Sequence, residues 1–186
     1  MIRPGSNKAT NNTAQFTNIK IALRYDCVKE NNNLKILECF AGKQLIWKSI
    51  EKKLNVKTDR TTIDANKNFN PDFNMNALKF LKNNDLNKYD IIDLDSWGSP
   101  IKYLEVLFKK QFKGTVILTY CSPVLMNPDK ILCDNFYKAI YNNCNKKILL
   151  NKDIGIMFKQ YLFDNNIFDY KGLISKNRVY CSIIIK

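Results

Sequence analysis

Short apolar runs of strand type alternate along this chain with stretches that have the spacing of an amphipathic helix. Such alternation is typical of a parallel β-sheet with helices on both faces, and strands that are apolar almost throughout indicate burial on both faces. The sequence therefore predicts an α/β fold. The expected strands are residues 34–40, 61–63, 89–94, 114–120 and 178–185, and the expected helices are residues 19–28, 44–54, 76–81, 101–112, 129–141 and 153–163.

The first part of the chain differs in composition from the rest. Residues 1–18 are polar and rich in helix breakers, a short helix is expected over 19–28, and asparagines at 31–33 mark a turn. A chain of 186 residues has room for one domain of ordinary size. We therefore predict an N-terminal extension with a short helix at 1–33 and one α/β domain at 34–186.

The chain carries a strong excess of positive charge. Its 30 Lys and Arg residues exceed its 17 Asp and Glu residues, which gives a net charge of +13. Such an excess favours a polyanionic partner, so RNA or DNA is the expected one. Lysine is far commoner than arginine, and Asn and Ile are abundant too, as in proteins of AT-rich genomes. This bias reduces the weight of the charge as a sign of nucleic-acid binding.

Composition also excludes several kinds of site. The chain has no histidine, which excludes Ser-His-Asp and Cys-His catalysis and histidine metal ligands. None of the six cysteines lies in a C-x-x-C pair, so we expect buried reduced thiols, no metal and a cytoplasmic protein. No apolar run has the length of about 18 residues that a membrane span needs, so no membrane partner is expected.

In an open α/β sheet, ligands bind beyond the carboxyl ends of the strands. After the first strand, Glu38 is followed by a turn of small residues, Ala41-Gly42, that would let a ligand approach the backbone. No G-x-G-x-x-G is present, so a ligand without a pyrophosphate fits better than NAD or FAD. After the second strand, Asp64 stands about 20 residues beyond Gly42, where an acid can accept two ribose hydroxyls. The alternatives are a plain strand-to-helix turn and a helix N-cap.

The segment Asp93-Leu94-Asp95-Ser96-Trp97-Gly98-Ser99-Pro100 follows the third clear strand. Alternation along a strand places Asp93 and Asp95 on the same side. An acid and an aromatic on a tightly turned loop can bind an exocyclic amine and stack on a flat base. In the alternative interpretation, Asp95 caps the next helix and Trp97 covers the sheet edge.

The order of these motifs resembles that of the class I, Rossmann-like S-adenosylmethionine (SAM)-dependent methyltransferases. The segment 93–100 is similar to the Asp-Leu-Asp-Pro-Phe-Gly-Ser-Pro segment of the tRNA guanine N2-methyltransferase family. The resemblance covers about residues 34–125 and departs from the family at Ser96, which replaces a proline, and at Lys43-Gln44, where a second glycine is usual. It implies a mostly parallel central sheet with an antiparallel C-terminal strand, and a catalytic domain at 34–186. The chain lacks room for that family's RNA-binding domain, so the tRNA substrate does not carry over.

The resemblance also implies roles for individual residues. Asp95 would face the target amine and Trp97 would stack on the target base, as the catalytic pair. Asp64 would hold the ribose hydroxyls, and Asn76 would read the adenine amine in place of an aspartate. The cofactor residues would be Glu38, Phe40, Ala41, Gly42, Asp64, Asn76 and Asp93, and the substrate residues Ser96, Gly98, Ser99 and Pro100.

The leading hypothesis is an N-methyltransferase that acts on an exocyclic amino group of a nucleobase in RNA or DNA, with SAM as cofactor. The sulfonium is already electrophilic, so the protein mainly aligns the amine with the methyl group and needs no histidine. A non-catalytic nucleic-acid-binding module on a degenerate methyltransferase fold is the first alternative, motivated by Lys43-Gln44. A methyltransferase of a protein or small molecule is the second.

Overall fold

The computed structural model describes residues 14–31, 33–96, 99–121, 154–174 and 178–186. The helices are α1 (Ala14–Val28), α2 (Leu45–Leu54), α3 (Ala77–Asn83), α4 (Ile101–Lys109) and α8 (Ile154–Asp164), with a short 3-10 turn η1 (Lys67–Phe69). The strands are β1 (Lys35–Cys39), β2 (Asp59–Asp64), β3 (Phe73–Asn74), β4 (Ile91–Leu94), β5 (Gly114–Cys121), β6 (Tyr170–Ile174) and β7 (Arg178–Ile185).

The strands form one seven-stranded sheet in the order β3-β2-β1-β4-β5-β7-β6. Strands β3, β2, β1, β4 and β5 run parallel, whereas β7 is antiparallel to both of its neighbours, β5 and β6. The predicted fold is therefore confirmed, including the antiparallel strand at the end of the chain. The order reverses beside β1, because the chain runs from β1 outward to β3 and then returns to β4 on the other side of β1.

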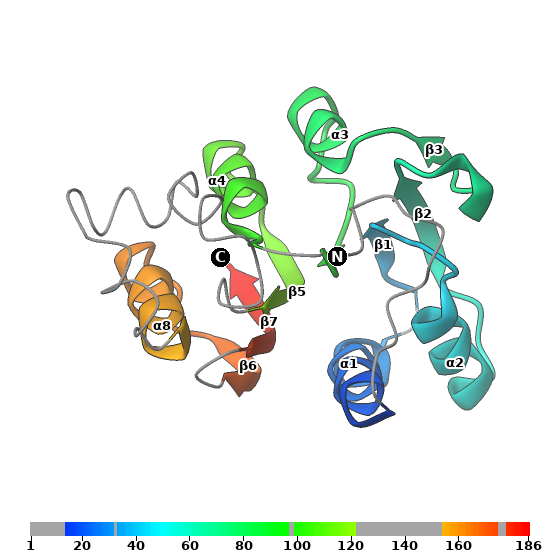
Figure 1. Cartoon of the computed structure of the whole chain (residues 1–186), viewed down its shortest axis with the longest axis horizontal. Coiled ribbons are helices and arrows are strands. Elements are labelled where there is room, and N and C mark those ends of the chain that lie inside the picture. The colour runs from blue at the N-terminus through cyan, green and yellow to red at the C-terminus, as the bar shows by residue number, and fades with distance from the viewer. Residues whose placement is uncertain (1–13, 32, 97–98, 122–153, 175–177) are drawn as a thin grey trace, which may run out of the picture.

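Helices cover both faces of the sheet (Figure 1), α1 and α2 on one and α3, α4 and α8 on the other. Alternation along β4 decides which side chain meets which layer: Ile91 packs with α1 and α2, whereas Ile92 and Leu94 pack with the larger core under the other three helices. Trp47 of α2 is fully buried in the smaller core. Both faces of β4 thus contribute to an apolar core.

Apart from α1, the described helices follow their sequence signals closely. Asn76 caps α3, since its side chain accepts a hydrogen bond from the backbone N–H of Lys79 at 3.3 Å. The first helix begins at Ala14, earlier than expected, and α1 packs against α2 and the sheet. The division of the chain at residue 33 stays a prediction. The helix expected over 129–141 lies outside the described residues.

Two strands were not predicted. β3 has only two residues, and β6 is exposed along most of its length, so neither has the apolar run that marks a buried strand. None of the described helices is both long enough and apolar enough to cross a bilayer.

Candidate functional site

The carboxyl ends of β1 and β4 flank the point where the strand order reverses. In open α/β sheets this switch point is where ligands bind. The turn after β1 and the segment after β4 therefore define the candidate site. Glu38 and Asp93 lie opposite each other in the ladder that joins β1 to β4.

The turn after β1 has an unusual backbone. Three alternate residues, Phe40, Gly42 and Gln44, have φ angles of 63°, 52° and 57°, in the left-handed region. Glycine adopts this region freely, whereas other residues are strained in it. Only one of the three is glycine, and such strain is commonly held at functional sites. The ring of Phe40 packs edge-on against Tyr103, with centroids 5.3 Å apart.

Asp64 is tied to this turn. Its Oδ2 accepts a hydrogen bond from the backbone N–H of Gly42 at 2.9 Å, and its Oδ1 accepts one from the N–H of Asn66 at 2.8 Å. Each carboxylate oxygen can accept two hydrogen bonds, so each keeps capacity for another donor. The side chain is half-buried at the sheet edge. The structure thus brings the two predicted cofactor motifs, Gly42 and Asp64, together.

Glu38 lies in a buried cluster of charges. Its Oε2 accepts a hydrogen bond from Arg60 Nη1 at 2.5 Å, and Arg60 also bonds Glu51. Burial and the neighbouring Asp93 outweigh Arg60 and raise the pKa of Glu38 to about 8. Glu38 therefore carries a proton for much of the time at neutral pH.

Asp93 lies deeper, beneath α1 and α2, and is 1% exposed. Arg24 holds it at two points, and Trp47 Nε1 donates to its Oδ2 at 2.7 Å. Burial raises the pKa of Asp93 despite Arg24. Its carboxylate contacts groups of the protein itself, so its assignment to the cofactor stays a prediction that these contacts do not support.

Asp95 lies on the same side of the sheet as Asp93, as the alternation predicts. Its Oδ1 accepts hydrogen bonds from Lys20 Nζ at 2.7 Å and Thr119 Oγ1 at 2.8 Å, and its Oδ2 is 3.4 Å from Arg24 Nη2. Burial would raise the pKa of Asp95, but Arg24 and Lys20 hold it below its usual value. This carboxylate is ionised, fixed in orientation and 18% exposed.

The other predicted residues are placed as follows. Asn76 is engaged as the cap of α3, and Ala41 is buried. Ser99 Oγ accepts a hydrogen bond from the N–H of Ile101 at 3.3 Å, at the start of α4 beside Pro100. Ser96 is buried. Trp97 and Gly98 lie outside the described residues.

The sequence analysis missed the groups that neutralise these acids. Lys20 and Arg24 are one turn apart on α1, and both are almost fully buried. Two cations at this spacing on the apolar face of a short helix are a signal that buried acids lie opposite, because buried charges are paired.

Within the described residues no group of three or more Cys, Asp or Glu side chains is placed to hold a metal ion.

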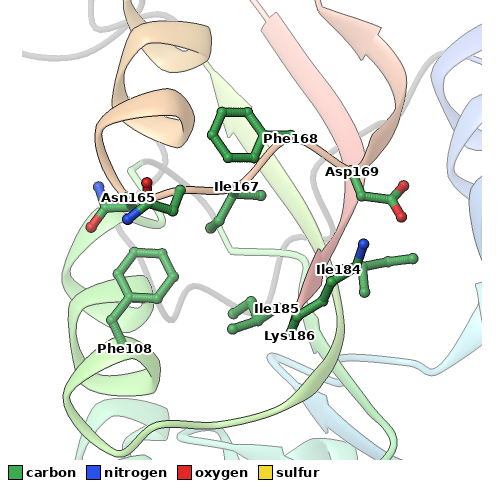
Figure 2. Close-up of a pocket in the computed structure, with 9 residues that line it drawn as sticks. Phe108, Asn165, Ile167, Phe168, Asp169, Ile184, Ile185 and Lys186 are labelled. Carbon is green, nitrogen blue, oxygen red and sulfur yellow. The ribbon is translucent and has the colours of Figure 1, made fainter.

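A pocket of about 360 Å³ lies elsewhere (Figure 2). Phe108 of α4, Ile167 and Phe168 after α8, and Ile185 of β7 line it. Ile185 pairs with Gly114, the first residue of β5. The pocket is thus at the amino edge of the parallel strands, the edge opposite to the candidate site, and it has no part in the predicted chemistry.

Solved structures with a similar fold include methyltransferases. The plantazolicin methyltransferase BpumL, in complex with a monoazolic desmethylPZN analog and SAH, matches with a TM-score of 0.53 and 13% identity over 92% of this chain and 84% of that one. Its complex with a triazolic analog matches with a TM-score of 0.52 and 12% identity, over the same shares of both chains. This chain has the class I methyltransferase fold.

A SAM-dependent methyltransferase from Archaeoglobus fulgidus matches with a TM-score of 0.47 and 15% identity, over 82% of this chain and 69% of that one. No model of a known protein family and no curated protein matches the chain. The similarity of residues 93–100 to the tRNA guanine N2-methyltransferases stays a prediction.

Proposed function

We propose that this chain is a SAM-dependent methyltransferase. The observation that carries the proposal is the fold, a sheet of order β3-β2-β1-β4-β5-β7-β6 with antiparallel β7, which matches the fold of BpumL, a protein crystallised with S-adenosylhomocysteine (SAH). The switch point of this sheet carries an acid-lined turn. Both features fit a nucleoside ligand without phosphate.

The cofactor would lie against the turn after β1. Asp64 has an unused acceptor site on each oxygen and would hold the ribose hydroxyls. Among the described residues, a Cβ built at Gly42 would come within 4 Å of the Phe40 carbonyl oxygen alone, at 3.8 Å, so these residues leave space for a ligand beside Gly42. Glu38 and Ala41 would border the amino-acid end of the ligand. The bound cofactor supplies a methyl group on a positively charged sulfur.

The finer proposal is transfer to an exocyclic amino group of a nucleobase. An ionised, immobile Asp95 would accept a hydrogen from the amine and stabilise the positive charge that develops on it. Trp97 would stack on the base, with Gly98, Ser99 and Pro100 shaping the loop. The net charge of +13 supports a nucleic-acid substrate.

Two other functions are supported by particular observations. Lys43-Gln44 stands where the methyltransferases usually have a second glycine, which favours a module that has lost cofactor binding and retains nucleic-acid binding. BpumL was crystallised with azole-containing analogs, which favours a substrate other than nucleic acid.

Calorimetry with SAH tests the first step. We expect micromolar binding and a loss of at least about tenfold in affinity in Asp64→Ala, since each lost hydrogen bond to a ligand costs about 1.4 kcal/mol. Asp85→Ala is the matched control. Asp85 accepts a hydrogen bond from the N–H of Asn87, two residues later, just as Asp64 accepts one from Asn66, but Asp85 is exposed and lies before β4, away from the candidate site. Absence of SAH binding to the wild type would refute the proposal that this chain is a SAM-dependent methyltransferase.

A methyl-transfer assay with labelled SAM tests the substrate. The panel contains unmodified tRNA transcripts, single- and double-stranded DNA, and a mixture of basic proteins. Transfer to nucleic acid that Asp95→Asn abolishes, with SAH affinity unchanged, supports the finer proposal. Transfer to the proteins alone contradicts it, and salt-dependent nucleic-acid binding without SAH affinity favours the non-catalytic module.

A further inference from the structure

Ser96 lies two residues beyond the end of β4, and its side-chain hydroxyl makes no hydrogen bond in the described part of the chain. The residue is 4% exposed, and its backbone N–H donates to the carbonyl of Leu94 at 2.7 Å. Its Oγ is buried and has no hydrogen-bond partner in the described part of the chain. A buried hydroxyl without a partner destabilises the protein, because it has lost water and gained nothing. Such a group calls for an explanation.

The neighbouring Asp95 is in the opposite state. Its Oδ1 accepts two hydrogen bonds at 2.7 and 2.8 Å, and its Oδ2 faces Arg24. Much of the hydrogen-bond acceptor capacity of Asp95 is therefore taken up by groups of the protein, on the α1 side of the sheet. Of the two polar side chains that follow β4, only that of Ser96 makes no hydrogen bond within the described part of the chain.

The position of Ser96 in the sheet suggests what its hydroxyl meets. β4 pairs with β1, and the strand order reverses between these two strands. A ligand at this switch point lies beyond the carboxyl ends of both strands. Ser96 is two residues beyond the last residue of β4, Leu94, and so lies at this edge.

We propose that the Ser96 hydroxyl forms a hydrogen bond with an S-adenosyl ligand bound between the carboxyl ends of β1 and β4. This inference rests on the proposed function and assigns to the cofactor a residue that the sequence resemblance assigns to the substrate. Ser96 is then a binding residue, held without a protein partner so that the ligand completes its hydrogen bonding. In the ligand-free protein, the unpaired hydroxyl lowers the free energy of unfolding.

The test compares two variants that each remove one unpaired buried hydroxyl. Ser96→Ala removes the hydroxyl at the candidate site. Tyr89→Phe is the matched control, since the Tyr89 hydroxyl is also buried without a hydrogen-bond partner in the described chain but stands before β4, at the opposite end of that strand. Thermal unfolding without ligand and calorimetry with SAH are measured for both.

We expect both variants to unfold at a higher temperature than the wild type without ligand. Ser96→Ala alone should bind SAH about tenfold more weakly, as the loss of one hydrogen bond to a ligand predicts. In the presence of saturating SAH, Ser96→Ala should therefore gain less in unfolding temperature than Tyr89→Phe does.

Three results overturn the inference, and one of them also overturns the proposed function. If the wild type binds SAH and Ser96→Ala binds it equally well, Ser96 does not contact the ligand and the enzyme proposal stands. If Ser96→Ala lowers the unfolding temperature without ligand, the hydroxyl already has a partner. If the wild type does not bind SAH, the proposed function and this inference fail together.

Discussion

Arg24 of α1 and Asp93 of β4 form a two-point ion pair inside the protein. Arg24 Nε lies 2.7 Å from Asp93 Oδ2, Nη2 lies 2.7 Å from Oδ1, and the two side chains are 3% and 1% exposed. Burying two charges is costly, and the pair is tolerated because each charge compensates the other. This ion pair therefore joins the first helix to the centre of the sheet. Removal of either partner would leave the other charge buried and uncompensated.

Removing one partner of this pair should destabilise the fold strongly. We expect Arg24→Met to lower the free energy of unfolding by about 3–5 kcal/mol, because it leaves the Asp93 charge buried and uncompensated. Urea unfolding measures this, and the double variant Arg24→Met/Asp93→Asn should recover part of the loss. Lys29→Met, which breaks the exposed pair with Asp26, should leave the stability unchanged. Equal losses in the single and double variants would show that the pair itself is unimportant.

The stability of the protein should fall as the pH rises from about 5 to 8. The pKa of Glu38 is raised from 4.5 to about 8, so in this window the folded state holds a proton that the unfolded state has released. No histidine titrates here. Glu38→Gln should reduce the slope, by up to about 1.4 kcal/mol per pH unit. Urea unfolding at four pH values checks this, and an unchanged slope would assign the effect to Asp93, whose pKa is raised too.

Relief of the strained turn should stabilise the protein. Gln44 precedes α2 with a φ of 57° and makes no side-chain cap hydrogen bond. We expect Gln44→Gly to raise the free energy of unfolding by about 1 kcal/mol, since glycine adopts this conformation without a steric cost. Gly42→Ala, at a φ of 52°, should lower it by a similar amount. A loss of stability in Gln44→Gly would mean that the glutamine side chain contributes more than the strain costs.

The edge strand β6 should depend on Gly172. A Cβ at this position would stand 2.1 Å from the Tyr180 carbonyl oxygen and 2.7 Å from Cys181 Cα, and φ is 137°. Gly172→Ala should therefore separate β6 from β7 and speed hydrogen exchange at the amides that join them. Protection in β1 and β4 should persist, because these strands are remote from β6 in the sheet. Unchanged exchange in β6 would contradict this account of the pairing.

The sequence predicted the central fold well for a physical reason. β1, β4 and β5 are buried on both faces, so their apolar runs are continuous and easy to recognise. β3 and β6 lie at the two edges, where little burial is needed and the pattern is correspondingly weak. The start of α1 was misjudged because its first residues, Ala14-Gln15-Phe16-Thr17-Asn18, mix apolar and polar types and continue a polar segment, so the apolar spacing that marks the helix is clear only from Ile19.

The site was predicted less completely than the fold. The spacing of Gly42 and Asp64 assigned both residues to one cofactor site, and the structure joins them by a hydrogen bond that the sequence did not predict. The local sequence around Asp93 and Asp95 gave no sign that Lys20 and Arg24 bind these acids. Those contacts join residues about 70 positions apart and depend on how α1 packs. Buried ion pairs of this kind are a property of tertiary structure that local patterns do not report.

The hydrogen bond between Asp64 and the N–H of Gly42 has a consequence for selectivity among nucleotides. Backbone N–H groups in a turn of this kind are the donors that a phosphate group would take. Here the protein's own carboxylate already accepts one of them, so an incoming phosphate would meet a negative charge in its place. We therefore expect this turn to bind ATP-like and dinucleotide ligands less well than nucleosides that carry free hydroxyls and no phosphate.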